Sequence, residues 1–191
     1  MQILIALIGI SSVGLAAFCI ESRLAKNRKI QPLNILLPCL LAALLVLRFY
    51  QTPLMIIKGV FLLLALFYAA VQDIQTREVD DSVSIIIAMT ALIQFDPTKA
   101  IYMLLGAIAT ALPLFIAAVI KPGKLGGADV KIMAASGFLL GTEKGMIALM
   151  AGLLLAVICI PFYRTIKKRP GKAAFALVPF LAAGIFAAFL L

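Results

Sequence analysis

The sequence predicts an all-α fold, a polytopic bundle of transmembrane helices that forms a single domain over residues 1–191. Of its 191 residues, 64% are apolar and only 13% are charged, and the mean hydropathy is +1.17. A soluble globular domain is about 45–50% apolar and about 25% charged, so this composition requires lipid as a solvent. The apolar runs lack an alternation of period two and are dominated by Leu, Ala, Ile and Met, which favours helices over strands.

Eight apolar segments are predicted to form the helices, in this order along the chain: 3–20, 33–49, 54–72, 82–95, 100–120, 130–140, 145–163 and 173–191. The first segment lacks a positively charged region before it and a small-residue cleavage site after it. It is therefore interpreted as a retained span rather than a signal peptide. Segments 82–95 and 130–140 are shorter than the roughly 20 residues that a straight helix needs to cross the hydrocarbon. The number of membrane segments is therefore about eight, within a range of six to eight.

The basic residues indicate that the N-terminus lies outside the cell. In that orientation, 13 of the 17 Lys and Arg residues fall in four loops that face the cytoplasm: 21–32, 73–81, 121–131 and 164–172. The other four fall on the external side: Arg48, Lys58, Lys99 and Lys144. Proteins of the inner (plasma) membrane carry such an excess of basic residues on the cytoplasmic side. Because the net charge of +9 is spread over short loops, it does not indicate a nucleic-acid-binding surface.

Two residue counts exclude several kinds of catalytic and metal site. The chain has no histidine, which rules out Ser-His-Asp and Cys-His triads, HExxH metalloproteases and haem ligation by histidine. Its three cysteines, Cys19, Cys39 and Cys159, lie inside apolar runs without CxxC spacing, so neither a disulfide framework nor a zinc site is indicated. We expect no metal and no cofactor, and any acid–base chemistry must use carboxylates, Lys, Tyr or Cys.

Most of the eight acidic residues have an ordinary structural explanation. Asp96 and Glu143 fall in short external loops, where they are expected to be solvated turn residues. Glu21 follows the first apolar segment and balances the charge of the basic residues around it. Glu78, Asp80 and Asp81 fall in a cytoplasmic loop, and Asp81 is predicted to cap the helix that starts at Ser82.

Asp73 and Asp129 are different, because each lies at the cytoplasmic end of an apolar segment. Asp73 follows the run 54–72, and Asp129 lies between Gly126–Gly127 and the segment that opens at Val130. An ionised Asp at bilayer depth costs roughly 2.5–3.5 kcal/mol, so such residues usually face a protein or water-filled interior. Two carboxyl groups that meet in a bundle cannot easily both ionise, and they share one proton. That state suits peptide hydrolysis, in which one carboxylate takes a proton from water while its protonated partner polarises the carbonyl.

The spacing of Asp73 and Asp129 and their depth in the membrane leave three other interpretations open. A pair of carboxylates within a membrane also suits proton or cation transport. Alternatively, Asp129 caps a helix beside the glycine pair, and Asp73 is an ordinary loop residue. The chain could also be a non-catalytic membrane subunit of a secretion assembly. Transporters often show an internal repeat or broken helices in corresponding halves, and the sequence has no clear repeat.

Three segments resemble motifs of the type IV prepilin peptidase family, whose members are membrane aspartyl proteases. Residues 126–135, GGADVKIMAA, resemble the GxGD-x-K-L motif. Residues 73–81, DIQTREVDD, resemble the first aspartate motif, D-x-x-x-x-x-(I/L)-P-(N/D). Residues 175–184, FALVPFLAAG, are similar to a terminal segment of the form PFGPFLALG. The resemblance runs in order from about the first segment to the C-terminus.

The resemblance implies an aspartic endopeptidase with Asp73 and Asp129 as its catalytic pair. Gly126 and Gly127 would let the backbone approach closely at the active site, and Ala128 keeps a small residue before the second aspartate. The substrates would be prepilins or prepilin-like proteins (pseudopilins). They would be cut at the cytoplasmic face of the membrane, after a short basic leader.

Two basic residues lie close to the acids in the chain. Lys131 matches the lysine of the second motif, and Arg77 lies four residues after the first aspartate. Either residue would orient the acids or tune their electrostatics. Each suits equally well a basic anchor on the cytoplasmic side.

Three departures from the family pattern affect what the resemblance implies. Ala128 stands where the family often has glycine, and Asp80 replaces the proline of the first motif, which predicts a less rigid loop. Residues 21–32 are too few for the cytoplasmic insert with two CxxC pairs that bifunctional members use for N-methylation. The chain therefore resembles the short, protease-only branch, and N-methyltransferase activity is not expected. Its expected partners are the substrate protein and the lipid bilayer, and the sequence assigns no oligomeric state.

Overall fold

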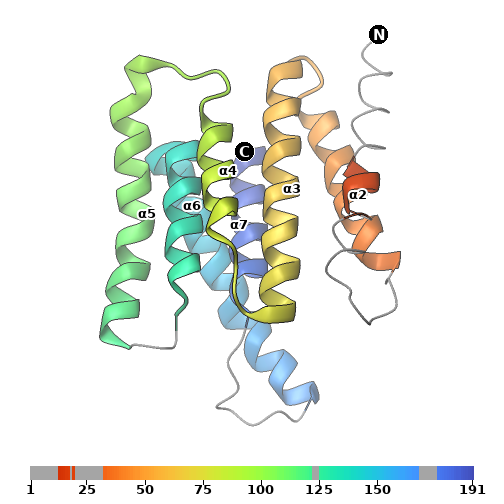
Figure 1. Ribbon diagram of the computed structural model, residues 1–191, viewed down its shortest axis with the longest axis vertical. Helices are drawn as coiled ribbons and strands as arrows, with labels where there is room; N and C mark the ends of the chain where they lie inside the picture. Colours follow the sequence, from red (N-terminus) through yellow and green to blue (C-terminus); the bar gives the residue numbers. More distant parts are fainter. Residues whose placement is uncertain (1–12, 18, 20–31, 122–124, 168–175) are drawn as a thin grey trace.

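The computed structural model describes residues 13–17, 19, 32–121, 125–167 and 176–191 (Figure 1). Most of the predicted segment 3–20 and the loop 21–31 therefore lie outside the described residues. The described elements are all helical, which confirms the predicted all-α class: α2 (Pro32–Arg48), α3 (Pro53–Thr76), α4 (Asp81–Ala91), the short 3₁₀ helix η1 (Pro97–Lys99), α5 (Ala100–Ile120), α6 (Gly127–Lys167) and α7 (Val178–Leu190).

The helices have the length and the surface of a membrane bundle. Within the described residues, three stretches are long and apolar enough to cross a membrane: Pro53–Thr76, Pro97–Ile120 and Gly127–Phe162. Large apolar side chains project outward from α5, as Leu104, Ile108, Leu112 and Phe115 are each at least half exposed. Such a surface is unfavourable in water and favourable against lipid tails. The fold is therefore that of a helical membrane bundle.

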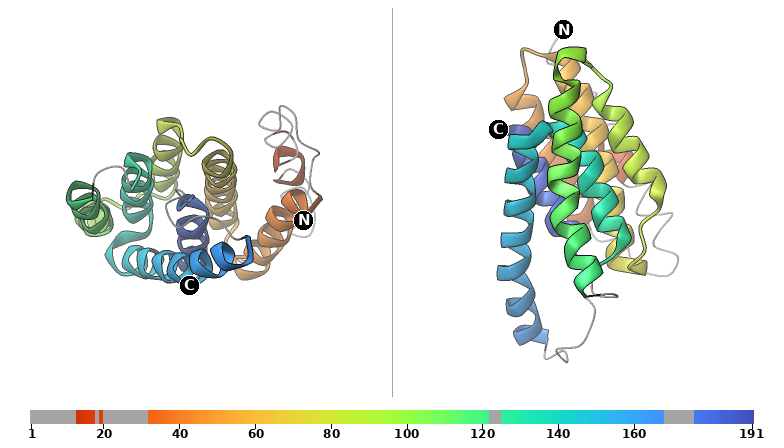
Figure 2. Two further views of the ribbon diagram at one scale, coloured as in Figure 1. Left: turned by 90° about the horizontal axis from the view of Figure 1, so that it is seen from below. Right: turned by 90° about the vertical axis from the view of Figure 1, so that its left-hand side faces the viewer.

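Helix α6 consists of two arms that meet at Gly141. This glycine has φ 76° and ψ −177°, a backbone conformation that side chains rarely allow. The first arm, residues 127–140, runs toward the end of the bundle where α4 leads into α5, and the second arm, residues 142–167, returns beside it (Figures 1 and 2). The arms correspond to the predicted segments 130–140 and 145–163. The first arm is about 21 Å long at 1.5 Å per residue, shorter than the hydrocarbon core, as its length in the sequence indicated.

Two predictions about α4 are wrong in detail. The helix ends at Ala91 rather than at residue 95, because the chain turns back there and Gln94 takes a left-handed φ of 59°. Asp81 does not cap a helix at Ser82. The helix already begins at Asp81, the capping position belongs to Asp80 without a side-chain cap bond, and the Asp81 carboxylate binds Lys131 instead.

Small residues let α6 pack closely against its neighbours. A methyl group on Gly106 of α5 would lie 2.6 Å from the backbone of Gly141, and one on Gly184 of α7 would lie 2.6 Å from the nitrogen of Gly152. The hydroxyl of Thr110 on α5 lies 2.8 Å from the carbonyl oxygen of Met133. Close backbone approach and hydrogen bonds between helices are the main attractive forces for helix packing in lipid.

Helix α7 is the centre of the bundle. Eight of its 13 residues are buried, among them Leu181 and Ile185. It packs against both α3 and α6 and lies between them in the view from below (Figure 2). Helix α4 also packs against both α3 and α6. The two helices that carry the candidate aspartates are therefore joined through α4 and α7.

The described parts of the predicted cytoplasmic loops 73–81 and 121–131 lie at one end of the bundle. The segment after α3 and the first turn of α6 are both at the lower end in Figure 1, where α5 ends and the second arm of α6 descends. The α2–α3 turn and the α4–α5 connection lie at the opposite end. The predicted loop 164–172 is described only as far as Lys167.

Candidate active site

Asp73 lies in the last two turns of α3, with 8% of its surface exposed. Its Oδ2 accepts a hydrogen bond from the backbone N–H of Val178, at 2.9 Å. Val178 is the first residue of α7, and the residue before it provides no side-chain cap. Because the first N–H groups of a helix lack partners within the helix and carry a positive partial charge, they bind a carboxylate well. The Asp73 side chain therefore serves as the cap of α7.

Asp129 lies in the first turn of α6 and is 6% exposed. Its Oδ2 accepts a hydrogen bond from the backbone N–H of Gly126, at 3.0 Å, while its own N–H donates to the carbonyl oxygen of Gly126 at 3.2 Å. The two bonds form a small closed turn that holds the carboxyl group against the start of the helix. The positive end of the α6 dipole favours a negative charge at this place.

The structure brings the two aspartates to the same end of the bundle. They are 56 positions apart in the chain, yet one lies in the last turns of α3 and the other in the first turn of α6, and these two helix ends lie at the same end of the bundle (Figure 1). Both are buried, and each is oriented by a backbone N–H of a different segment. Acid and base action on a single water molecule requires two carboxyl groups that share one proton, and these aspartates are the two buried carboxyl groups that the described part of the fold places at this end.

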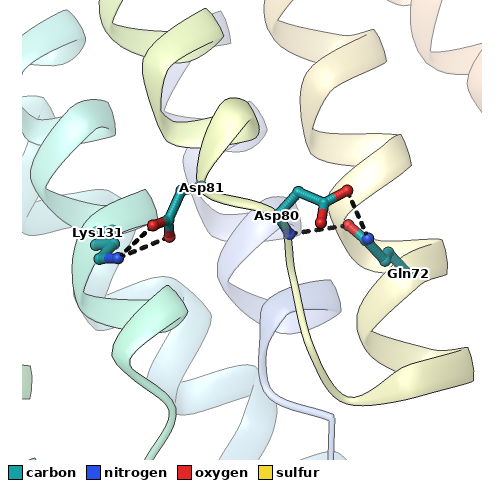
Figure 3. Close-up of polar contacts among 4 residues, drawn as sticks. All are labelled: Gln72, Asp80, Asp81 and Lys131. Carbon is teal, nitrogen blue, oxygen red and sulfur yellow. Dashed lines mark hydrogen bonds and ion pairs between the residues drawn. The ribbon is translucent and has the colours of Figure 1, made fainter.

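The ammonium group of Lys131 binds Asp81 and not the two candidate aspartates. Its Nζ lies 2.7 Å from both carboxylate oxygens of Asp81, the first residue of α4 (Figure 3). Both side chains are more than half exposed. Lys131 thus lies two residues from Asp129 on α6 but connects that helix to α4.

Asp80 is bound on the other side, by α3. Its Oδ2 accepts a hydrogen bond from Gln72 Nε2 at 2.8 Å, and its own N–H donates to Gln72 Oε1 at 3.1 Å (Figure 3). The hydroxyl of Tyr68 also donates to Asp80 Oδ2, at 3.0 Å. The sequence places Gln72 at the end of the apolar run 54–72 and Asp80 in the loop 73–81, and the spacing of these polar residues does not indicate the contacts.

Arg77 closes α3 in a left-handed conformation with φ 60°, which is uncommon for a residue other than glycine. Its backbone N–H donates to the carbonyl oxygen of Asp73 at 3.0 Å. Its side chain is exposed. Arg77 thus ends the helix one turn after Asp73.

The two motif glycines have different surroundings. A methyl group on Gly126 would lie 3.2 Å from Asp129 Oδ2, so a side chain there would crowd the carboxyl group. A methyl group on Gly127 would meet nothing within 4 Å. Ala128 is partly buried in the first turn of α6. The packing within this chain therefore explains a glycine at 126, and it gives no steric reason for one at 127.

The C-terminal segment contributes a group that sequence reasoning missed. The resemblance identified 175–184 only as a similar stretch, whereas the structure places the N–H of Val178 on Asp73. The chemistry of a backbone N–H is the same for every residue but proline, so no local signal marks it. Among the described residues, no group of three or more Cys, Asp or Glu side chains is arranged to hold a metal ion.

Comparison with known proteins adds one finding. The sequence matches the model of the type IV leader peptidase family over residues 60–161, which is more than half of the chain. The matched range includes both candidate aspartates, and it ends before α7. No curated protein and no solved structure matches the chain.

Proposed function

The chain belongs to the type IV leader peptidase family, and on that premise we propose that it is an aspartic endopeptidase with Asp73 and Asp129 as its catalytic pair. The observation that carries the proposal is the position of two buried carboxyl groups, on α3 and α6, at the same end of the bundle. Buried acids in a lipid-embedded bundle are costly unless they serve a function.

In the proposed reaction, one proton is shared by the two carboxyl groups. The ionised carboxylate takes a proton from a water molecule, whose oxygen bonds to the carbonyl carbon of the scissile peptide. The protonated partner donates a hydrogen bond to the carbonyl oxygen and stabilises the charge that develops there. The tetrahedral intermediate then collapses as the C–N bond breaks, and a carboxyl group gives a proton to the leaving amine. The pair ends with one proton, ready for another cycle.

Two backbone groups support this chemistry by orienting the acids. The N–H of Val178 binds Asp73, and the N–H of Gly126 binds Asp129, in each case through Oδ2. Each carboxyl group is thereby kept in one orientation. Its other oxygen, Oδ1, then acts on the water molecule or on the carbonyl of the peptide. Keeping reacting groups in a fixed geometry supplies a large part of catalysis.

The proposed substrates are prepilins or pseudopilins, cut at the cytoplasmic face of the inner membrane. The support for this face is that the two aspartates lie at the end of the bundle that holds the described parts of the predicted basic loops 73–81 and 121–131. A short basic leader would be held there by the anionic headgroups of the cytoplasmic leaflet. The apolar helix of the substrate would lie in the bilayer beside the bundle.

The test compares Asp73→Asn and Asp129→Asn with the wild type on a purified prepilin in detergent. Asparagine keeps an oxygen that can accept the backbone hydrogen bond, so both variants should unfold near the wild-type temperature. Removing acid–base catalysis should lower the cleavage rate by at least about 10²–10⁴-fold.

Glu143→Gln is the matched control, because Glu143 is an exposed acid at the opposite end of the bundle. It should cleave at the wild-type rate. Substantial cleavage by either aspartate variant would remove the aspartic mechanism and leave membership of the family untouched.

A further inference from the structure

The connection between α3 and α4 carries two adjacent carboxylates that point in opposite directions. Asp80 turns toward α3, and Asp81 turns toward α6 (Figure 3). The connection therefore touches both helices that hold the candidate catalytic pair. Neither carboxylate has a part in the proposed proton transfers.

The contact with α3 is next to Asp73. Asp80 is bound by Gln72, the residue before Asp73, and by Tyr68, one turn earlier on the same face of the helix. Three hydrogen bonds of 2.8–3.1 Å attach the start of α4 to this turn of α3. A tilt or rotation of the end of α3 would break them and would also move Asp73.

The contact with α6 is next to Asp129. Lys131 lies two residues after Asp129, and both oxygens of Asp81 lie 2.7 Å from its ammonium group. An ammonium group that lies against both oxygens of one carboxylate makes charge-assisted hydrogen bonds, which are stronger than neutral ones. A shift of the first turn of α6 along or away from α4 would break them and would also move Asp129.

The hydrogen bonds of Asp80 hold the α3–α4 loop in place of the proline that this chain lacks. The first motif of the resembled family has proline at this position, and a loop without it was expected to be less rigid. Here the side chain of Asp80 holds the same segment against α3. The backbone N–H that a proline would lack is used as well, because it donates to Gln72.

We propose that Asp80 and Asp81 form a two-sided clasp that sets the separation between Asp73 and Asp129. The inference rests on the proposed function, and in that reaction both are positioning residues that touch neither water nor peptide. Since proton sharing needs two carboxyl groups at a fixed distance, a loosened clasp lowers turnover while substrate still binds. A displacement of about 1 Å is enough to lower a rate by roughly 10²-fold.

The test uses charge reversal and its rescue. Asp81→Lys places two ammonium groups against each other and should lower kcat by about tenfold or more, with KM changed less than about twofold. The double variant Asp81→Lys/Lys131→Asp restores an ion pair with opposite polarity and should recover most of kcat. Asp96→Asn is the matched control, because it removes another ion pair, Asp96 with Lys99, at the far end of the bundle. It should leave kcat and KM unchanged.

A second measurement tests the clasp by distances between helices and needs no assay of substrate cleavage. Spin labels at Gln75, exposed on α3, and at Gly127, where a side chain meets nothing, report the separation of α3 and α6 in a variant without native cysteines. The distance distribution should broaden in Asp81→Lys and narrow again in the double variant. The inference is overturned if kcat and the distances are unchanged in Asp81→Lys, or if the double variant rescues neither. If the wild type shows no cleavage, the proposed function fails, and the distances alone still decide whether the clasp exists.

Discussion

At the scale of single residues, the candidate site depends on how two carboxyl groups are held rather than on unusual side chains. Each accepts a backbone N–H at the start of a helix: Val178 at the start of α7 binds Asp73, and Gly126, just before α6, binds Asp129. The helix termini thus provide donors that would otherwise lack partners. The N–H of position 126 could come from any residue but proline, whereas the lack of a side chain matters because a methyl group there would press on the carboxyl group that the N–H binds.

The Gly126→Ala variant tests this close approach. Its methyl group would lie 3.2 Å from Asp129 Oδ2, so the carboxyl group must shift. We expect kcat/KM to fall by on the order of tenfold, with the unfolding temperature nearly unchanged. Gly127→Ala is the control, because its methyl group meets nothing, and its kcat/KM should stay within about twofold of the wild type. Equal losses in both variants would show that crowding of Asp129 is not the cause.

At the scale of helices, close packing of α5, α6 and α7 fixes the platform on which the site is built. Small residues line the contacts, and the Thr110 hydroxyl bridges from α5 to Met133 on the first arm of α6. At the far end of α3, Lys58 is buried and donates to the carbonyl oxygen of Ile93, just after α4, at 3.2 Å. Its ammonium group thereby satisfies a carbonyl near the C-terminal end of α4, where the helix dipole favours a cation.

The Gly137→Ala variant tests the contact between α5 and α6. Its methyl group would collide with the carbonyl oxygen of Gly106 and with the hydroxyl of Thr110, so the helices must move apart. We expect the free energy of unfolding in detergent to fall by about 1–3 kcal/mol. Ala117→Leu, at an exposed position of α5, should change it by less than about 0.5 kcal/mol. An unchanged stability for Gly137→Ala would mean that the two helices do not meet as closely as described.

At the scale of the whole molecule, the two ends of the bundle differ in composition and in role. One end gathers the two aspartates, the clasp and the segments that follow α3 and precede α6, while the opposite end holds the α2–α3 turn and η1. Apolar side chains of α5 cover the outside between the ends. The excess of basic residues in the predicted cytoplasmic loops predicts that the end with the aspartates faces the cytoplasm.

Cysteine labelling in intact cells tests this orientation. In a background without Cys19, Cys39 and Cys159, single cysteines are placed at Glu78 and Thr98, which are exposed at opposite ends. A maleimide that does not cross the inner membrane should label position 98 and spare position 78 until the cells are permeabilised. The reverse pattern would place the candidate site on the external face.

The sequence alone determined the features that depend on local composition. Runs of apolar residues predicted the helices from 32 to 120 within a few residues, because a segment in lipid must satisfy its own backbone hydrogen bonds. The rarity of acids identified Asp73 and Asp129, and the interruption after Leu140 indicated that α6 would turn. Each of these properties is present in a short stretch of chain and needs no knowledge of its neighbours.

Only the tertiary structure decided which groups meet. The N–H of Val178 reaches Asp73 across 105 positions, and Lys131 reaches Asp81 across 50. Asp81 would make a reasonable helix cap in isolation, and it binds Lys131 because α6 brings an ammonium group within 2.7 Å. Such contacts depend on the packing of α4 and α7 between α3 and α6, which is a property of the folded bundle and of no single segment.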